Sequence, residues 1–203
     1  MVQNVKIVNK SLYHTQNFVS ICLSTVFLVS FCAGNDIIFH SEKIVFEIHE
    51  NYCRVSANYT FRNDFQKDIQ RILYYPFPDN KNLPFPCSIM VTAENGDLIE
   101  YKNNQNGITF PIRIPPNNTQ CCTVIYEQAT SDQFFEYILN TTMDWHFPLT
   151  SVEFIIVVPD NISIDDISLS DYKITREDDK TRYRIYRENF RSDENLLIQW
   201  RLK

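Results

Sequence analysis

Glycine is rare in this sequence: only 3 of the 203 residues are glycines, namely Gly34, Gly96 and Gly107. Loops that hold phosphate groups need several glycines close together, because only a residue without a side chain lets the backbone approach a phosphate so closely. The three glycines are too far apart in sequence to form one such loop. Their scarcity therefore excludes P-loop and dinucleotide-binding folds.

Catalytic signatures and concentrated positive charge are also missing. The sequence has neither a G-x-S-x-G element for a nucleophilic serine nor an H-E-x-x-H element for zinc. Its formal net charge is −6, and its basic residues are dispersed except for Arg182, Arg184 and Arg187. Nucleic-acid binding requires a concentrated basic face. We therefore expect no nucleic-acid partner, no cofactor and no metal, and we favour a protein that is not an enzyme.

The apolar content, by contrast, is sufficient for a folded core. The composition is 44% hydrophobic and 22% charged, with 15 phenylalanines and 11 tyrosines. These values are ordinary for a globular protein and too apolar for a disordered chain. There is no internal repeat and no linker rich in glycine or serine, so residues 35–203 are predicted to form a single domain.

Residues 1–34 have the features of an export signal. Lys6 and Lys10 precede an uncharged apolar run from Phe18 to Ala33, and Gly34 follows it. A basic start, an apolar stretch and small residues at a cleavage point are typical of a signal peptide. We expect the segment to be cleaved near Cys32 to Gly34, kept as a membrane anchor, or lipidated at Cys32. All three alternatives predict an exported domain that is periplasmic, secreted or tethered to the outer face of the membrane.

Four cysteines follow the export segment: Cys53, Cys87, Cys121 and Cys122. Four cysteines allow three disulfide pairings, and the sequence does not choose among them. Their spacing contains no CxxC pair, so a zinc knuckle is not supported. Buried free thiols and one disulfide remain equally open.

Apolar and polar residues alternate through most of the sequence after residue 35. Segments 53–61, 108–114, 122–126 and 196–202 follow this period of two most clearly. Alternation indicates strands that are buried on one face, whereas the almost fully apolar segment 152–158 indicates a central strand covered on both faces. We predict an all-β, antiparallel sandwich of ten or eleven strands, with at most one helical turn between Thr130 and Tyr137.

Two Asn-Gly pairs predict tight hairpins, because both central residues of a type I′ turn need a positive φ. A two-residue turn at Asn95-Gly96 pairs Thr92 with Ile99 and Met90 with Tyr101. The second turn is expected at Asn106-Gly107.

The stretch Tyr59-Thr-Phe61-Arg-Asn63, followed by Tyr75-Pro-Phe77-Pro78, resembles the vault and inter-alpha-trypsin type of β-sandwich. In those domains an aromatic strand ends in asparagine, and a later strand ends in a proline–apolar–proline corner. The resemblance covers roughly residues 44–128 and implies a fold rather than a chemistry. In that family a metal-binding von Willebrand type A domain usually follows, and we expect no such α/β domain within residues 129–203.

The acidic residues near position 165 are weak candidates for a metal site. Asp166, Ser168 and Ser170 match the spelling of the metal-ion adhesion motif, but no glycine or helix accompanies them. Asp160, Asp165, Asp166 and Asp171 could supply oxygen ligands to calcium, yet their spacing fits no EF-hand loop. A strand with exposed serines and a solvated acidic edge is the favoured interpretation.

The remaining candidates are histidines and an aromatic loop. His40, His49 and His146 are far apart in sequence and form no ligand pattern. The loop around Trp145 is either a binding platform for a sugar or peptide, or a plug over one end of the sandwich, and we favour the plug.

The sequence favours a non-catalytic exported module that binds a protein partner or supports an envelope assembly. The alternative is an extracytoplasmic hydrolase, for example one that acts on glycans, with a site built from loops. The segment Leu196–Leu202 contains no proline or glycine and ends the sequence, so it is a candidate edge strand for an extended or acidic partner. A central, fully paired strand is an equal alternative.

Overall fold

The computed structural model describes residues 36–78, 80 and 82–203, so the predicted export segment 1–34 lies outside the described residues. The described chain is a β-sandwich of 13 strands, which confirms the predicted fold class and exceeds the expected strand number by two or three. Within these ranges, no helix is long and apolar enough to cross a membrane. The elements are β1 (Ile38–Ile48), β2 (Tyr52–Asn63), β3 (Ile69–Pro76), β4 (Cys87–Ala93), β5 (Lys102–Asn104), β6 (Gly107–Ile114), β7 (Asn118–Ala129), β8 (Phe134–Tyr137), the 3₁₀ helix η1 (Asn140–Asp144), β9 (Leu149–Pro159), β10 (Ile162–Ile167), β11 (Lys173–Glu177), β12 (Lys180–Phe190) and β13 (Leu196–Leu202).

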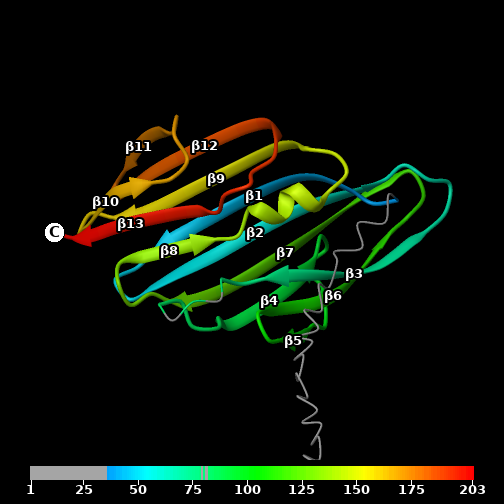
Figure 1. Cartoon of the computed structure of the whole chain (residues 1–203), viewed down its shortest axis with the longest axis horizontal. Coiled ribbons are helices and arrows are strands. Elements are labelled where there is room, and N and C mark those ends of the chain that lie inside the picture. The colour runs from blue at the N-terminus through cyan, green and yellow to red at the C-terminus, as the bar shows by residue number, and fades with distance from the viewer. Residues whose placement is uncertain (1–35, 79, 81) are drawn as a thin grey trace, which may run out of the picture. The chain divides into compact units, whose positions relative to one another are not determined.

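One layer of the sandwich is a seven-stranded sheet in the order β11-β12-β9-β1-β2-β7-β4. Figure 1 shows these strands side by side, with β1 near the middle. All neighbours are antiparallel except β1 and β9, which run parallel. The first described strand therefore joins the two halves of the sheet.

The second layer consists of two three-stranded sheets, β10-β13-β8 and β3-β6-β5. Ring contacts show what each covers: Tyr137 of β8 packs on Phe46 of β1 at 5.2 Å, and Tyr75 of β3 packs on Tyr126 of β7 at 6.1 Å. The buried side chains of all three sheets form one hydrophobic cluster. Strands β3 and β8 are the edges at which the two small sheets face each other over β1 and β2.

A β-bulge in β1 decides which of its side chains point into the core. Phe39 pairs with Phe61 and Ser41 pairs with Thr60, so His40 is an extra residue without a partner on β2. An extra residue reverses the alternation of the strand. As a result Phe39 points inward before the bulge and Glu42 points inward after it, in phase with Ile44.

The other face of the seven-stranded sheet carries charged side chains. Glu153 of β9 binds Lys43 at 3.0 Å and Arg184 at 2.5 Å. The basic residues that cluster in the sequence thus lie beside carboxylates: Arg182 pairs with Glu177, and Arg187 pairs with Asp171. Exposed ion pairs of this kind contribute little stability.

Two local predictions are corrected by the structure. Thr92 pairs with Leu98 rather than with Ile99, because the connection at Asn95-Gly96 is a three-residue loop and not a two-residue turn. Within this loop only Gly96 has a positive φ, which is +86°. The stretch Thr130–Tyr137 contains strand β8 and no helical turn. Segment 152–158 lies in the central strand β9 as predicted, although Glu153 and Ile155 remain half-exposed on the charged face.

Gly107 begins β6 and is required for a close approach of two strands. Asn104 pairs with Gly107, so the second hairpin turns at Gln105-Asn106, one residue before the predicted position. A Cβ atom on Gly107 would lie 2.3 Å from the carbonyl oxygen of Tyr75 and 2.8 Å from the ring of Tyr74. Real Cβ atoms do not approach backbone oxygens this closely, so β3 and β6 would have to separate.

Replacing Gly107 by alanine is therefore expected to destabilise the protein by about 1–3 kcal/mol, the usual range for overpacking. Urea unfolding of the full chain measures the loss. The matched control is Gly96→Ala, where nothing lies within 4 Å and the cost is only that of a positive φ. Equal effects of the two substitutions would contradict this account.

Candidate functional site

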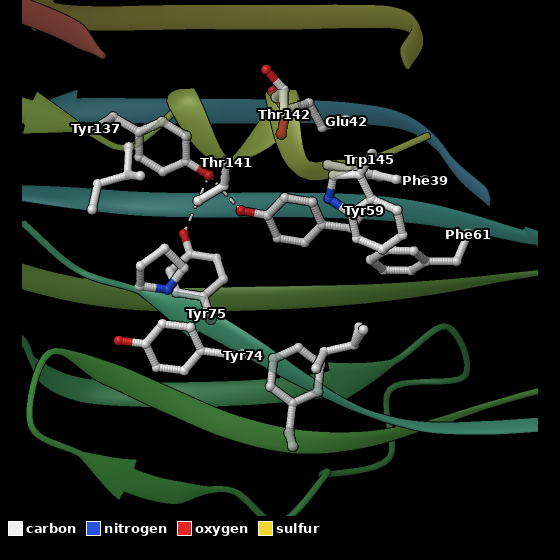
Figure 2. A pocket seen from close by; sticks show the side chains of 14 residues that line it. Phe39, Glu42, Tyr59, Phe61, Tyr74, Tyr75, Tyr137, Thr141, Thr142 and Trp145 are labelled. Carbon is white, nitrogen blue, oxygen red and sulfur yellow. Dashed lines mark hydrogen bonds between the residues drawn. The ribbon is translucent and has the colours of Figure 1, made fainter. Parts of the chain in front are cut away.

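A cavity of about 60 Å³ lies over β1 and β2, where the edges of the two small sheets face each other. We call it the interlayer cavity (Figure 2). Ten of its lining residues are buried, and the four that are half-buried mark its mouth: Tyr74, Pro76, Ile138 and Thr141. The complete lining consists of Phe39, Glu42, Tyr59, Phe61, Leu73, Tyr74, Tyr75, Pro76, Phe110, Tyr137, Ile138, Thr141, Thr142 and Trp145.

Three tyrosines bring their hydroxyl groups together in the wall of the cavity. The hydroxyl oxygens of Tyr59 and Tyr137 are 2.5 Å apart, and Tyr75 donates a hydrogen bond of 3.3 Å to Tyr137. Figure 2 shows these three groups pointing toward one another from β2, β3 and β8. Burial raises the pKa of all three, that of Tyr75 to about 12, so each hydroxyl remains neutral at physiological pH.

Glu42 is the acidic member of the lining and is 6% exposed. Its Oε1 atom is buried and has no hydrogen-bond partner among the described residues. Burial raises the pKa of the Glu42 carboxyl from 4.5 to about 8, because the charged form loses its hydration. A buried polar atom without a partner costs about 1–3 kcal/mol, so this side chain calls for an explanation other than stability.

Aromatic rings form the other end of the cavity. Trp145 packs against Phe39 at 5.3 Å and Phe61 at 5.9 Å, as Figure 2 shows. Arg191 holds the backbone of this loop, because its guanidinium donates hydrogen bonds of 2.7 Å to the carbonyl oxygens of Trp145 and His146. Trp145 is thus buried in the lining rather than displayed on the surface.

The 3₁₀ helix is tied to the segment between β12 and β13. Thr142 accepts a hydrogen bond of 2.9 Å from the backbone N–H of Ser192. The side-chain oxygen of Asn195 accepts hydrogen bonds from the N–H groups of Leu139 and Asn140. These contacts fix one side of the cavity mouth, since Thr141 and Ile138 belong to the same short segment.

The lining combines one carboxyl, hydroxyl groups and aromatic surfaces. None of the lining residues, all within the described ranges, is lysine, arginine or histidine. The groups that can meet a ligand are therefore hydrogen-bond acceptors, neutral donors and π faces. Hydrolysis of a glycoside requires two carboxyl groups, and a nucleophilic mechanism requires a base beside the nucleophile. The residues that line the cavity include neither pair.

The acidic residues considered as metal ligands do not gather at one point. Asp160 binds Arg176 at 2.8 Å, Asp165 binds Arg201, and Asp166 is exposed. Over residues 36–203, apart from the two undescribed positions, no group of three acidic, histidine or cysteine side chains could hold a metal ion. Ser168 and Ser170 are exposed and Ile167 is buried, but β10 ends at Ile167, so the two serines follow the strand rather than forming its wet face.

The histidines and cysteines also lie apart from the cavity. His40 is within 3.1 Å of Thr150, His49 stacks on Tyr52 at 4.2 Å, and His146 is exposed. The four cysteines are free thiols, of which two are fully buried: Cys53 and Cys122.

The proposed edge strand is not at an edge. Strand β13 is the middle strand of its sheet and pairs with both β10 and β8. Leu196, Ile198 and Trp200 are buried beneath it. The hypothesis that Leu196–Leu202 adds an extended partner at a free edge is therefore wrong, and the alternative of a central strand is correct.

Glu42 is a site residue that was not predicted from the sequence, although the sequence contains a signal for it. Glu42 has the same parity as Ile44, Phe46 and Ile48, so extending that strand toward the N-terminus puts a carboxyl on the buried face. An acidic residue in phase with a buried face is unusual enough to mark a site. The tyrosines come from strands distant in sequence, and only the fold brings them together.

Comparison with known proteins supports the fold and does not assign a family. No protein-family model matches the chain, and no curated protein sequence is significantly similar to it. A Legionella pneumophila protein proposed to bind nutrients has the same fold, with a TM-score of 0.66 at 15% identity. That alignment covers 81% of this chain and 67% of the Legionella chain.

An M1 zinc metallopeptidase from Deinococcus radiodurans, in its E323A form, aligns with a TM-score of 0.52 at 9% identity. The alignment covers 81% of this chain but 42% of the peptidase, so this chain spans less than half the length of that enzyme. Neither protein is a vault and inter-alpha-trypsin domain, and that resemblance stays a prediction. At these identities the comparisons establish a shared β-sandwich architecture.

Proposed function

We propose that this chain is an exported, non-catalytic binding module that holds the head group of a small molecule in the interlayer cavity. The observation that carries the proposal is the buried Oε1 atom of Glu42, which has no hydrogen-bond partner among the described residues. A ligand that binds this atom would compensate the cost of its burial. The binding role assigned to the Legionella protein of the same fold agrees with this function.

The size of the cavity limits what it can hold. Its volume of about 60 Å³ is several times that needed for one water molecule, and well below the roughly 150 Å³ of a cavity that holds benzene. A head group of a few heavy atoms fits, while the rest of the molecule extends through the mouth. A protein partner at the last strand loses its basis because β13 is central.

A thermal-shift screen of the full chain tests the proposal. Small amines, carboxylic acids, alcohols and sugars are added to the native protein and to a Thr141→Phe variant, in which a ring blocks the cavity mouth. At a concentration of 100 times its Kd, a ligand stabilises the native protein by about 2.7 kcal/mol. For a chain of this length we expect a rise in Tm of about 5–10 °C.

The Thr141→Phe variant should lose this response, whereas Thr175→Phe, a substitution at an exposed position in β11, should keep it. The proposal fails if no class of compound raises the Tm of the native protein. It also fails if each compound that does so stabilises the blocked variant equally.

A further inference from the structure

The lining of the interlayer cavity selects among ligands by charge. Its one ionisable group outside the tyrosines is Glu42, and no basic side chain among the described residues lines the cavity to neutralise it. The nearest cation on β1 is Lys43, which follows Glu42 and therefore points to the opposite face, where it binds Glu153. A carboxylate at Glu42 thus lacks a counter-charge within its own fold.

Glu42 supplies the polar atom of the lining that lacks a partner. The oxygen of Tyr137 receives a hydrogen bond from Tyr75 and shares another with Tyr59, so these hydroxyl groups are engaged with one another. The buried Oε1 of Glu42 is an acceptor without a hydrogen-bond partner among the described residues. A group with several N–H donors and no acceptor matches this arrangement.

The aromatic walls favour a cation. Phe39, Phe61 and Trp145 pack together at the end of the cavity shown in Figure 2, and Tyr59 lies 5.8 Å from Phe39. The face of an aromatic ring attracts an ammonium group, and this attraction grows when water is excluded. A carboxylate and ring faces in one buried site are the two kinds of group that bind ammonium in a dry environment.

We propose that the ligand of the interlayer cavity is a primary alkylammonium, with its head group on Glu42 and its apolar stem leaving between Tyr74 and Ile138. This inference rests on the proposed function and names the class of ligand for the same site. No covalent bond to the ligand forms: the ligand enters as a cation, the Glu42 carboxyl gives up its O–H proton to the solvent, and the resulting carboxylate binds the cation.

The inference couples binding to loss of a proton. Without a ligand the Glu42 carboxyl, with a pKa of about 8, is mostly protonated at neutral pH. The titratable groups that face it are Tyr59 from β2, Tyr75 from β3 and Tyr137 from β8, and all three stay neutral over this range. An ammonium binds the charged carboxylate, so it displaces one proton, while an amine with a pKa near that of lysine, about 10.4, remains charged.

Calorimetric titration of the full chain with n-butylammonium at pH 6, 7 and 8 tests the inference. Because the ionised fraction of Glu42 rises with pH, the affinity should be about 50-fold higher at pH 8 than at pH 6. Nearly one proton per bound ligand should be released at pH 6, as measured in buffers of different ionisation enthalpy. Butan-1-ol, the neutral probe of similar shape, should bind at least tenfold more weakly at pH 8 and show no such rise.

A Glu42→Gln variant should lose at least tenfold in affinity for butylammonium at pH 8 and lose the pH dependence. Glu47→Gln is the matched control, since Glu47 lies on the same strand but on the charged face, 3.7 Å from Arg54. If Glu42→Gln does not fold, the comparison of the two probes on the native protein decides alone.

The inference is overturned if butanol binds as tightly as butylammonium, or if the affinity for butylammonium does not rise with pH. In that case, an alcohol or acid that stabilises the native protein but not Thr141→Phe would leave the proposed function standing. Failure of all compounds to bind would remove both.

Discussion

We expect the unfolding free energy of a Glu42→Gln variant to increase relative to that of the native protein as pH rises from 5 to 8. The difference should change by about 1.4 kcal/mol for each pH unit. The folded-state pKa of Glu42 is raised by burial from 4.5 to about 8. Stability linked to a raised pKa is fully present below the ordinary value and is lost as pH rises toward the folded value. The native protein should therefore lose about 3 kcal/mol by pH 7, whereas the neutral glutamine does not titrate.

Urea unfolding of the full chain at pH 5, 6, 7 and 8 measures this difference. The slope with pH is the informative quantity, because a constant offset between the two proteins reflects the hydrogen bonds of the glutamine amide. Glu47→Gln controls for the removal of a carboxyl group from β1 outside the cavity, since Glu47 lies on the charged face beside Arg54. A parallel curve for Glu42→Gln would show that the Glu42 carboxyl is ionised in the folded protein.

Replacing Asn63 by aspartate is expected to cost at least 3 kcal/mol at neutral pH. Asn63 ends β2 and is fully buried. Its Nδ2 atom donates to the carbonyl oxygens of Lys67, Ile114 and Pro115 at 2.8–3.1 Å, and its Oδ1 atom accepts from the N–H of Phe65. Aspartate has the same shape but no N–H, so a buried carboxylate would face three carbonyl oxygens.

Asn118→Asp provides a closely matched control, because Asn118 pairs with Asn63 across β2 and β7 but is exposed. Its Oδ1 atom accepts a hydrogen bond from the N–H of Thr119, which a carboxylate can also accept. Its effect should stay within about 0.5 kcal/mol. Urea unfolding at pH 7 measures how much unfolding free energy each variant loses, and the loss for Asn63→Asp should be several times the loss for Asn118→Asp. Similar losses would refute the role given to Asn63.

The prediction from sequence was strongest where the determining contacts are local. Alternation along segments such as 53–61 identified strands correctly, since a period of two follows from which face of a strand is buried. Asn63 ends the aromatic stretch on which the family resemblance is based. In the structure its side chain joins β2 to the end of β6 through a hydrogen bond to the carbonyl oxygen of Ile114. Its place in the sequence was informative before its hydrogen bonds were known.

The prediction failed where pairing depends on distant segments. Segment 196–202 was considered an edge because it is last in sequence, yet β8 and β10 approach it from both sides. The Asn95-Gly96 pair correctly indicated a hairpin but gave the wrong strand register. An Asn-Gly sequence is compatible with both a two-residue turn and a three-residue loop, so it does not decide the loop length. Sequence order carries no information about either choice.

The candidate site was almost invisible in the sequence for the same reason. Tyr59, Tyr75 and Tyr137 are separated by up to 78 residues, and their meeting is a property of the layered fold. Glu42 alone could have been identified, from its phase with Ile44, but the bulge at His40 conceals that phase when the strand is read from Phe39 onward.

The parallel pairing of β1 with β9 has a consequence for the order of folding. Ser41 of β1 pairs with Ser151 of β9. About 110 residues must therefore be synthesised after β1 before its partner strand β9 exists. At roughly 5–20 residues per second, β1 waits about 5–20 seconds for its second neighbour. Non-local and parallel pairings also form slowly once the chain is complete.

During that interval the edge of β1 that β9 will cover is unpaired, and Phe46 has not yet met Phe154 of β9. An open edge beside an uncovered apolar face is the usual starting point for aggregation. Glu42 lies on that same face, and a carboxylate there is a gatekeeper that interrupts an otherwise apolar row. We therefore expect the residue that is costly in the finished fold to oppose aggregation of the chain while β9 is still being made.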